Sequence, residues 1–241
     1  MKVLFAGPSL HGSTRVVDPS ITLLPPAEQG DIVAAVHRGV SVIGLIDGVY
    51  ESIAAIWHKE ILFALSEGVQ VIGGASLGAL RAAECAAFGM IGVGEIFRDF
   101  QLGNLVDDAD VALLHAPREL GYRPLTEAMV DVRATVRWHV QVNNLDGEEG
   151  ERLLSSAESL FFKDRTWRRV ITGAGFPKDR RADLHTLLCH QSIRQKQMDA
   201  ELVLEHVTAA SDRRASLPTD WTFRRTSLFN PWLAVGRNPQ G

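Results

Sequence analysis

In the first 90 residues, short apolar runs alternate with longer stretches of helical spacing. The apolar runs cover residues 2–6, 40–46 and 69–73, and a glycine-containing turn follows each of them. Between them, residues 27–38 and 54–67 repeat apolar side chains with the spacing of amphipathic helices. Nearly continuous apolar strands that alternate with helices are typical of a parallel sheet covered on both faces. We therefore predict an α/β domain with a Rossmann- or flavodoxin-like sheet over residues 1–145.

The pattern changes in the second half of the chain. Residues 106–117 have an acidic turn followed by an apolar stretch, which predicts a further strand. Residues 125–143 have strong helical periodicity, with Thr126 as a candidate N-cap. From about residue 148 the spacing is helical, with a break at 173–177 and an irregular end. A mainly helical region is therefore expected over residues 146–241.

Composition narrows the class of protein. The 241 residues are 46% hydrophobic and 22% charged, which is ordinary for a globular chain. Cys85 and Cys189 lie far apart without metal-ligand spacing, so we interpret them as small residues in a reducing compartment. No apolar run reaches the length of a membrane span, and the first residues form a strand pattern rather than a signal-peptide core. We expect a cytoplasmic protein without a metal or cofactor.

Charge is distributed unevenly along the chain. Residues 1–150 carry 10 Lys and Arg against 19 Asp and Glu, whereas residues 151–241 carry 15 against 10. The basic excess is either an ordinary solvated surface or a surface that docks an acidic protein partner. Nucleic acid is not expected, because no binding motif accompanies the charge. The basic residues that cluster are Arg165, Arg168, Arg169, Lys178, Arg180 and Arg181.

The turn after the third apolar run contains the motif G-x-S-x-G. Gly74, Ser76 and Gly78 stand between the predicted strand and an alanine-rich helix, the context of a nucleophile elbow. The first N–H groups of that helix, those of Leu77 and Gly78, are candidates to hold an oxyanion. Such turns also bind phosphate or simply close a βα unit. Catalysis by Ser76 is thus one of three interpretations.

Parallel strands bring further polar residues to the same edge of the sheet. Ser9 follows the first apolar run, and Asp47 and Glu51 follow the second. The carboxyl ends of such strands line the ligand crevice, so these residues group with Ser76. Asp47 could orient a base, receive a proton or bind a cation, or it could bond backbone N–H groups in a turn. Glu51 is as well explained by an exposed or capping carboxylate.

Candidate cations and bases lie on the helices beside this edge. His58 and Lys59 are adjacent near a helix start, so only one of them can face the crevice. Lysine is either a base with a lowered pKa or a cation that anchors an anion. Arg81 could bind a carboxyl-like group, although an ion pair with Glu84 explains it equally well. His115, at the end of an apolar run, is either a site residue or a core histidine.

Taken in order, several short motifs in residues 1–140 resemble the TfuA-like proteins. The set is specific as a whole, although no single element is, and Leu77 stands where the family commonly has Met. The residues after about 145 carry no motif that we can place. The motifs are Gly7-Pro8-Ser9-Leu10, Pro25-Pro26-Ala27, Ile46-Asp47-Gly48-Val49-Tyr50-Glu51, Trp57-His58-Lys59-Glu60-Ile61, Gly74-Ala75-Ser76-Leu77-Gly78-Ala79-Leu80-Arg81-Ala82-Ala83-Glu84, Phe88-Gly89-Met90, His115-Ala116-Pro117 and Gly121-Tyr122-Arg123-Pro124-Leu125.

The resemblance implies a role in thioamidation of peptide backbones. TfuA-like proteins work beside YcaO-type enzymes, which activate a peptide amide with ATP. The resemblance implies hydrolysis of the C-terminal thiocarboxylate of a ThiS-like sulfur carrier, with sulfide released for the YcaO partner. A non-catalytic adaptor that docks the carrier onto that partner is the alternative. The positions carried over are Asp47, His58, Lys59, Ser76 and Arg81; with them we group Ser9, Glu51 and His115 as substrate-binding candidates.

Overall fold

A parallel sheet forms the centre of the first part of the chain. The computed structural model describes residues 1–49, 54–227 and 229. All strand pairs of the sheet are parallel, in the order β2-β1-β3-β4-β5. The expected α/β fold is therefore confirmed, and so are the three strands that the apolar runs predict. The bounds are β1 Lys2–Phe5, β2 Ile21–Leu24, β3 Val42–Leu45, β4 Gln70–Gly73 and β5 Ile91–Gly92.

The chain divides into two compact units. One consists of Met1–Val106 with Gln197–Gly241, and the other of Asp107–Lys196. The expected boundary after residue 145 falls inside the second unit, between two of its helices. The first unit holds α1 Asp31–His37, α2 His58–Ser66, α3 Leu77–Cys85, α4 Glu95–Leu102 and most of α9 Gln195–Ala209; the second holds α5 Met129–Gln141, α6 Gly147–Glu158, α7 Trp167–Gly173 and α8 Lys178–His190.

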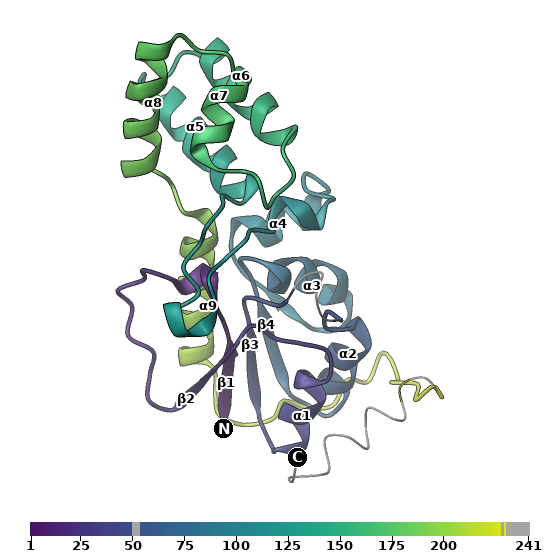
Figure 1. Cartoon of the computed structure of the whole chain (residues 1–241). Helices are drawn as coiled ribbons and strands as arrows, with labels where there is room; N and C mark the ends of the chain where they lie inside the picture. Colours follow the sequence, from purple (N-terminus) through teal and green to yellow (C-terminus); the bar gives the residue numbers. More distant parts are fainter. Residues whose placement is uncertain (50–53, 228, 230–241) are drawn as a thin grey trace. The chain divides into compact units, whose positions relative to one another are not determined.

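Helices cover both faces of the sheet, with α1, α2 and α3 on one side and α9 on the other (Figure 1). The strand pleat explains this division, because successive side chains point to opposite faces. Val3 and Phe5 pack with the first three helices, whereas Leu4 packs with α9. Gly44 allows α9 to approach closely, since a Cβ there would lie 2.7 Å from the Val207 side chain.

Polar contacts fasten α9 to the sheet unit at both of its ends. The Lys2 ammonium donates to the carbonyls of Val207 and Thr208 at 2.9 and 2.8 Å, where cations stabilise a helix C-terminus. Near the other end, the buried Asp199 carboxylate accepts the Ile96 N–H at 2.8 Å and caps α4. The last described helix of the chain is thus an integral part of the first unit.

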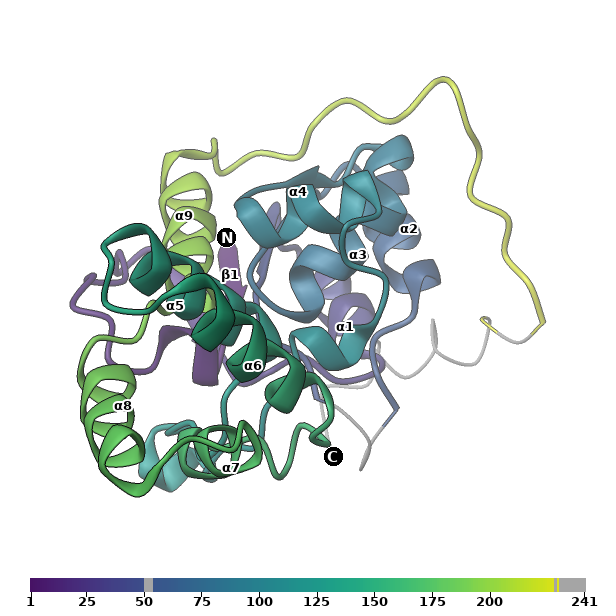
Figure 2. The same cartoon turned by 90° about the horizontal axis from the view of Figure 1, so that it is seen from above.

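After α9 the chain runs along the side of the sheet unit that holds α2 (Figure 2). The Ala215 N–H donates to the Gly68 carbonyl at 2.7 Å. Farther on, the Phe223 ring lies 5.7 Å from the Phe63 ring of α2. This described part of the C-terminal segment has no helix or strand, as its irregular sequence predicts.

The second unit is helical and has a core of its own. Apolar side chains from α5, α6, α7 and α8 form one buried cluster, with Met129, Leu153, Trp167 and Leu184 among its members. The expected helical character after residue 148 is confirmed, as is the break between α7 and α8. Every helix within the described ranges is too short or too polar to cross a membrane.

The structure differs from the sequence-based expectations in several details. β2 and the two-residue β5 were not expected, because their runs are short and stand beside proline or glycine. The strand expected within 106–117 is wrong: a 3-10 turn at Asp108–Asp110 is followed by irregular chain. The helix expected over 125–143 begins at Met129. Thr126 does not cap it, because its hydroxyl accepts the Leu114 N–H at 2.8 Å.

Candidate active site

The carboxyl ends of β1 and β3 meet where the direction of strand order reverses. β1 lies between β2 and β3, and crevices that bind ligands in such sheets form at this switch point. Asp47 follows β3 here and is only 2% exposed. Its carboxylate accepts the N–H groups of Gly7 and Ser9 at 2.8 and 3.1 Å and the Ser9 hydroxyl at 2.6 Å. Asp47 therefore holds the loop after β1 against the end of β3.

The turn between β4 and α3 is strained at the residue before the serine. The Ser76 N–H donates to the Gly74 carbonyl at 2.9 Å, which closes a γ-turn around Ala75. Ala75 has a φ of 68°, a conformation that costs a non-glycine residue free energy. Ser76 itself has φ −119° and ψ −127° and precedes the first residue of α3. In a nucleophile elbow the strained residue is the serine itself, whereas here it is Ala75, one residue earlier.

The Ser76 hydroxyl is not used to hold the fold within the described residues. It does not cap α3, and no hydrogen bond joins it to another described side chain or backbone group. Ser76 is 2% exposed, so the residue is buried. A hydroxyl that no described group holds is available for chemistry with a bound group.

Packing explains the glycines of the motif. A Cβ at Gly78 would lie 1.9 Å from the Leu45 carbonyl oxygen, and one at Gly74 would lie 2.6 Å from the Val93 carbonyl oxygen. Both glycines therefore permit close contact between backbones, irrespective of any catalytic role. The contact between Gly78 and Leu45 brings the serine turn beside the end of β3, where Asp47 stands.

The two amides expected to form an oxyanion hole differ in availability. The Gly78 N–H donates to the Ile46 carbonyl at 3.1 Å, so the fold already uses it. The Leu77 N–H, at the first residue of α3, has no acceptor within the described residues. A helix N-terminus favours negative charge, and the Leu77 amide, which no described group accepts from, is thus the remaining donor of the expected pair.

Cations expected at the site have other partners in the structure. Lys59 Nζ donates to the Thr226 hydroxyl at 3.3 Å and lies 5.7 Å from the centre of the Phe223 ring. Arg81 donates from Nε to the Ile56 carbonyl at 3.1 Å and from Nη1 to Glu84 at 2.6 Å. Neither side chain has a described hydrogen bond to Ser76.

His58 joins the same arrangement at the surface. Its Nε2 lies 3.2 Å from the carboxylate of Glu84, which also receives Arg81. The His58 side chain is 57% exposed, whereas that of Arg81 is 13% exposed. Arg81 and Glu84 thus form the expected ion pair within α3, and the bond from Arg81 to the Ile56 carbonyl ties α3 to the chain before α2.

Sequence reasoning gave Glu60 no role, although it is the most buried carboxylate near the start of α2. Its carboxylate accepts the Trp57 N–H at 3.3 Å and the Gly30 N–H at 2.8 Å. Burial raises the pKa of Glu60 to about 7. The sequence carries only half of a capping-box signal, because Glu60 stands three residues after the N-cap but the N-cap is Trp57, whose indole accepts no hydrogen bond.

Of the two remaining candidates, the structure describes one. Glu51 lies outside the described residues. His115 belongs to the second compact unit, where its Nδ1 lies 2.8 Å from the Ala116 carbonyl oxygen and its ring contacts Tyr122. Within the ranges 1–49, 54–227 and 229, no three His, Cys, Asp or Glu side chains are placed to hold a metal ion.

The basic cluster of the second unit is mostly engaged in structure. Arg165 is 5% exposed and donates to the carbonyls of Ala157 and Leu160, so it is not a docking residue. Arg180 forms a two-pronged ion pair with Glu149 at 2.7 and 2.8 Å. Both arginines therefore stabilise the helical unit, because buried or paired guanidinium groups satisfy nearby oxygens.

Residues 47–166 match the family model described as TfuA-like protein. The match begins at Asp47, includes the serine turn and Arg81, and extends into the second unit. No curated protein matches the chain.

Proposed function

The chain is a TfuA-like protein, and on that premise we propose that it hydrolyses the C-terminal thiocarboxylate of a ThiS-like sulfur carrier. The sulfide released would supply a YcaO-type enzyme that thioamidates a peptide backbone. The observation that carries the proposal is the Ser76 turn: its strained strand-to-helix backbone presents a hydroxyl and a Leu77 amide that no group in the described part of the chain holds. No cofactor is needed for this reaction.

The proposed chemistry proceeds through an acyl-serine. Ser76 Oγ attacks the thiocarboxylate carbon, the C–S bond breaks, and the serine proton leaves with the sulfur as hydrosulfide. Water then cleaves the ester, which gives the carrier carboxylate, a proton and free Ser76. The Leu77 N–H would stabilise the oxyanion of each addition step. Because no described base contacts Ser76, we assign the serine proton to the departing sulfur.

The surrounding residues take supporting roles in this proposal. Asp47 positions the loop that carries Ser9 against the end of β3. Arg81 would bind the negative carrier terminus once Glu84 exchanges away from its Nη1. Lys59, an alternative proton acceptor, would first have to break its hydrogen bond to Thr226. His58, whose side chain is exposed, would act at the surface beside Arg81 and Glu84.

The decisive experiment incubates the purified protein alone with thiocarboxylated carrier and follows the carrier by intact mass. Exchange of sulfur for oxygen is expected with the unaltered protein. Ser76→Ala should slow this exchange by orders of magnitude, as expected for loss of a nucleophile. Ser20→Ala, at an exposed serine, is the matched control and should retain full activity. Near-normal turnover by Ser76→Ala would leave direct attack by water as the remaining scheme.

The second candidate function is a non-catalytic adaptor that docks the carrier onto the YcaO-type enzyme. It is favoured by the lack of a described hydrogen bond between Ser76 and any basic side chain. The mass experiment separates the two functions, since an adaptor binds the carrier but leaves its mass unchanged over hours. Binding that survives without turnover would therefore replace the hydrolase proposal with the adaptor.

A further inference from the structure

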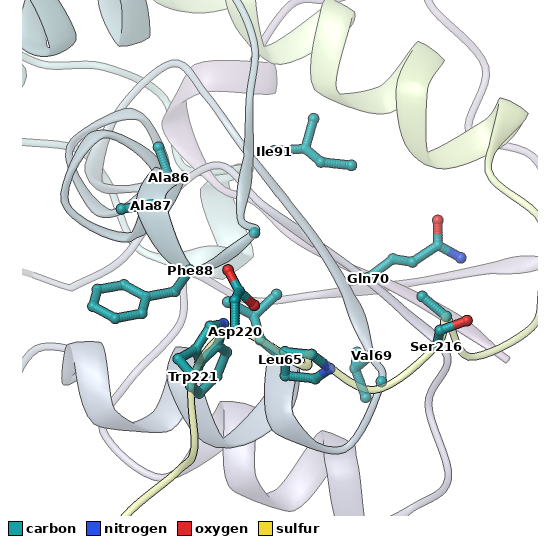
Figure 3. A pocket seen from close by; sticks show the side chains of 14 residues that line it. Leu65, Val69, Gln70, Ala86, Ala87, Phe88, Ile91, Ser216, Asp220 and Trp221 are labelled. Atoms are coloured by element: carbon teal, nitrogen blue, oxygen red, sulfur yellow. The ribbon is translucent and has the colours of Figure 1, made fainter.

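A concave site lies at the opposite end of β4 from Ser76. The cavity has a volume of about 470 Å³ and begins at the amino ends of β4 and β5, at Gln70 and Ile91. Its other walls come from the ends of α2 and α3 and from the segment after α9, as Figure 3 shows. A cavity of this size is large enough for an amino-acid side chain or a small ligand.

Specific hydrogen bonds fix the wall that the C-terminal segment contributes. Gln70 donates from its side-chain amide to the carbonyls of Ser211 and Arg213 at 3.1 and 2.9 Å. Arg214 donates to the carbonyls of Val36 and Glu67 at 3.0 and 3.2 Å. Arg214 is therefore held by the fold, and neither Arg213 nor Arg214 lines the cavity.

The cavity has one charged lining side chain, the carboxylate of Asp220. Within the described part of the chain, this carboxylate has neither a hydrogen-bond donor nor an ion-pair partner. In Figure 3 it lies with the Trp221 ring on the Phe88 side of the cavity, and Gln70 lies on the other side. An unpaired carboxylate in a concave site favours a ligand of positive charge.

Aromatic rings stand beside that carboxylate. Phe88 and Trp221 are arranged edge to face, with ring centroids 5.5 Å apart. Phe88 is 38% exposed, so solvent and ligands can reach it. The faces of aromatic rings attract cations, and a planar guanidinium can stack on a ring while it bonds to a carboxylate.

Helix ends add negative potential from the backbone. α2 ends at Ser66, and Leu65 and Gly68 line the cavity. α3 continues into a 3-10 turn at Ala86–Phe88 that ends at Gly89, and this turn forms another wall. Carbonyl groups at the C-termini of helices favour cations. The Asp220 carboxylate, the aromatic rings and the helix C-termini thus all favour a ligand of positive charge.

We propose that this cavity binds the guanidinium group of an arginine side chain on an exposed segment of a peptide or protein partner. Asp220 takes the two-pronged ion pair, and Phe88 and Trp221 stack against the guanidinium and its stem. The accessible rim favours a side chain presented from outside over an enclosed metabolite. This site is separate from Ser76 and does not depend on the proposed thiocarboxylate chemistry.

The test titrates the full-length protein with N-acetyl-arginine N-methylamide and with the neutral citrulline analogue. Binding is followed by calorimetry and by NMR shifts of the Gly68 and Gly89 amides and the Trp221 indole. Arginine should bind at least about tenfold more tightly than citrulline, a difference of about 1.4 kcal/mol. Asp220→Asn should remove this preference, whereas Asp179→Asn, at an exposed aspartate outside the cavity, should retain it.

A second variant and a second ligand keep the proposal open to refutation. Phe88→Leu should weaken arginine binding without changing the far-UV spectrum or the unfolding midpoint. Equal binding of arginine and citrulline, or an unchanged preference in Asp220→Asn, would overturn the proposal. Agmatine serves as the free guanidine: if it binds more tightly than a blocked Ala-Arg-Ala peptide, the assignment to a peptide side chain is wrong.

Discussion

At the scale of single residues, Asp47 joins two strand ends that are far apart in the sequence. Its buried carboxylate accepts three donors from the loop after β1, two of them backbone N–H groups. Hydrogen bonds to a charged group are worth more than neutral ones, and unmade bonds in a buried place are costly. Asp47 is therefore expected to be important for stability as well as for the geometry of the site.

Asp47→Ala should lower the free energy of unfolding by about 2–4 kcal/mol, because it leaves the buried N–H donors of Gly7 and Ser9 without their acceptor. Ser9→Ala is the control, since it removes one of the three bonds and leaves both backbone donors paired. Ser9→Ala should lower the free energy of unfolding by about 1 kcal/mol. Urea unfolding followed by circular dichroism measures both. Equal losses in the two variants would show that the carboxylate is not the anchor of this loop.

Gly78→Ala tests whether packing requires the second glycine of the motif. A Cβ there would lie 1.9 Å from the Leu45 carbonyl oxygen, so backbone must move and stability should fall by about 3 kcal/mol or more. Gly147→Ala is the matched control, because a Cβ at this helical glycine meets nothing within 4 Å. That change should be neutral or stabilising by up to about 1 kcal/mol. A tolerated Gly78→Ala would contradict the close contact.

At the scale of elements, the start of α2 is held by a carboxylate from within the helix. Glu60 accepts N–H groups from Trp57 before the helix and from Gly30 before α1. The bonds join two helix starts, but burial of the charged form opposes them. The junction should therefore respond to pH in the range where Glu60 titrates.

The sign of this response follows from the raised pKa. Between about pH 4.5 and 7 the folded protein keeps the Glu60 proton while the unfolded chain loses it. Glu60 therefore lowers stability progressively as pH rises through this window, by up to about 3 kcal/mol. Unfolding free energies of Glu60→Gln should fall less steeply across the window than those of the unaltered protein. Glu119→Gln, at an exposed glutamate, should not change the slope. Parallel curves for all three proteins would contradict the buried titration.

At the scale of the whole molecule, two compact units have separate cores. The sheet unit is completed by α9, which returns after the helical unit of Asp107–Lys196. The helical unit buries apolar side chains from four helices in a cluster of its own. A unit with its own core is expected to fold by itself.

Residues 107–196 expressed alone should give a helical circular dichroism spectrum and a cooperative thermal transition. Leu153→Ala, at a fully buried position of this core, should lower the midpoint in the fragment and in the full chain alike. Val142→Ala, at an exposed position, is the control and should change neither. A fragment without cooperative unfolding would show that this unit depends on the rest of the chain.

Local patterns in the sequence determine much of the sheet unit. Runs such as 40–46 are apolar throughout because both faces of a parallel strand are covered. Such a run therefore predicts both the fold class and the position of a strand. The local sequence also determines the turn after β4, where Gly74 and Gly78 flank Ser76 between a strand and a helix. The ion pair between Arg81 and Glu84 needs only their spacing on one helix.

Tertiary structure alone decided which distant groups meet. Nothing near Asp47 in the sequence shows that its partners are Gly7 and Ser9, because the pairing depends on β3 lying beside β1. The same holds for α9 on the second face, for Lys59 at Thr226, and for Gly78, whose amide is taken by Ile46. Sequence periodicity reports the burial of a residue in its own element, whereas its partners depend on how elements pack, and a local pattern does not contain that information.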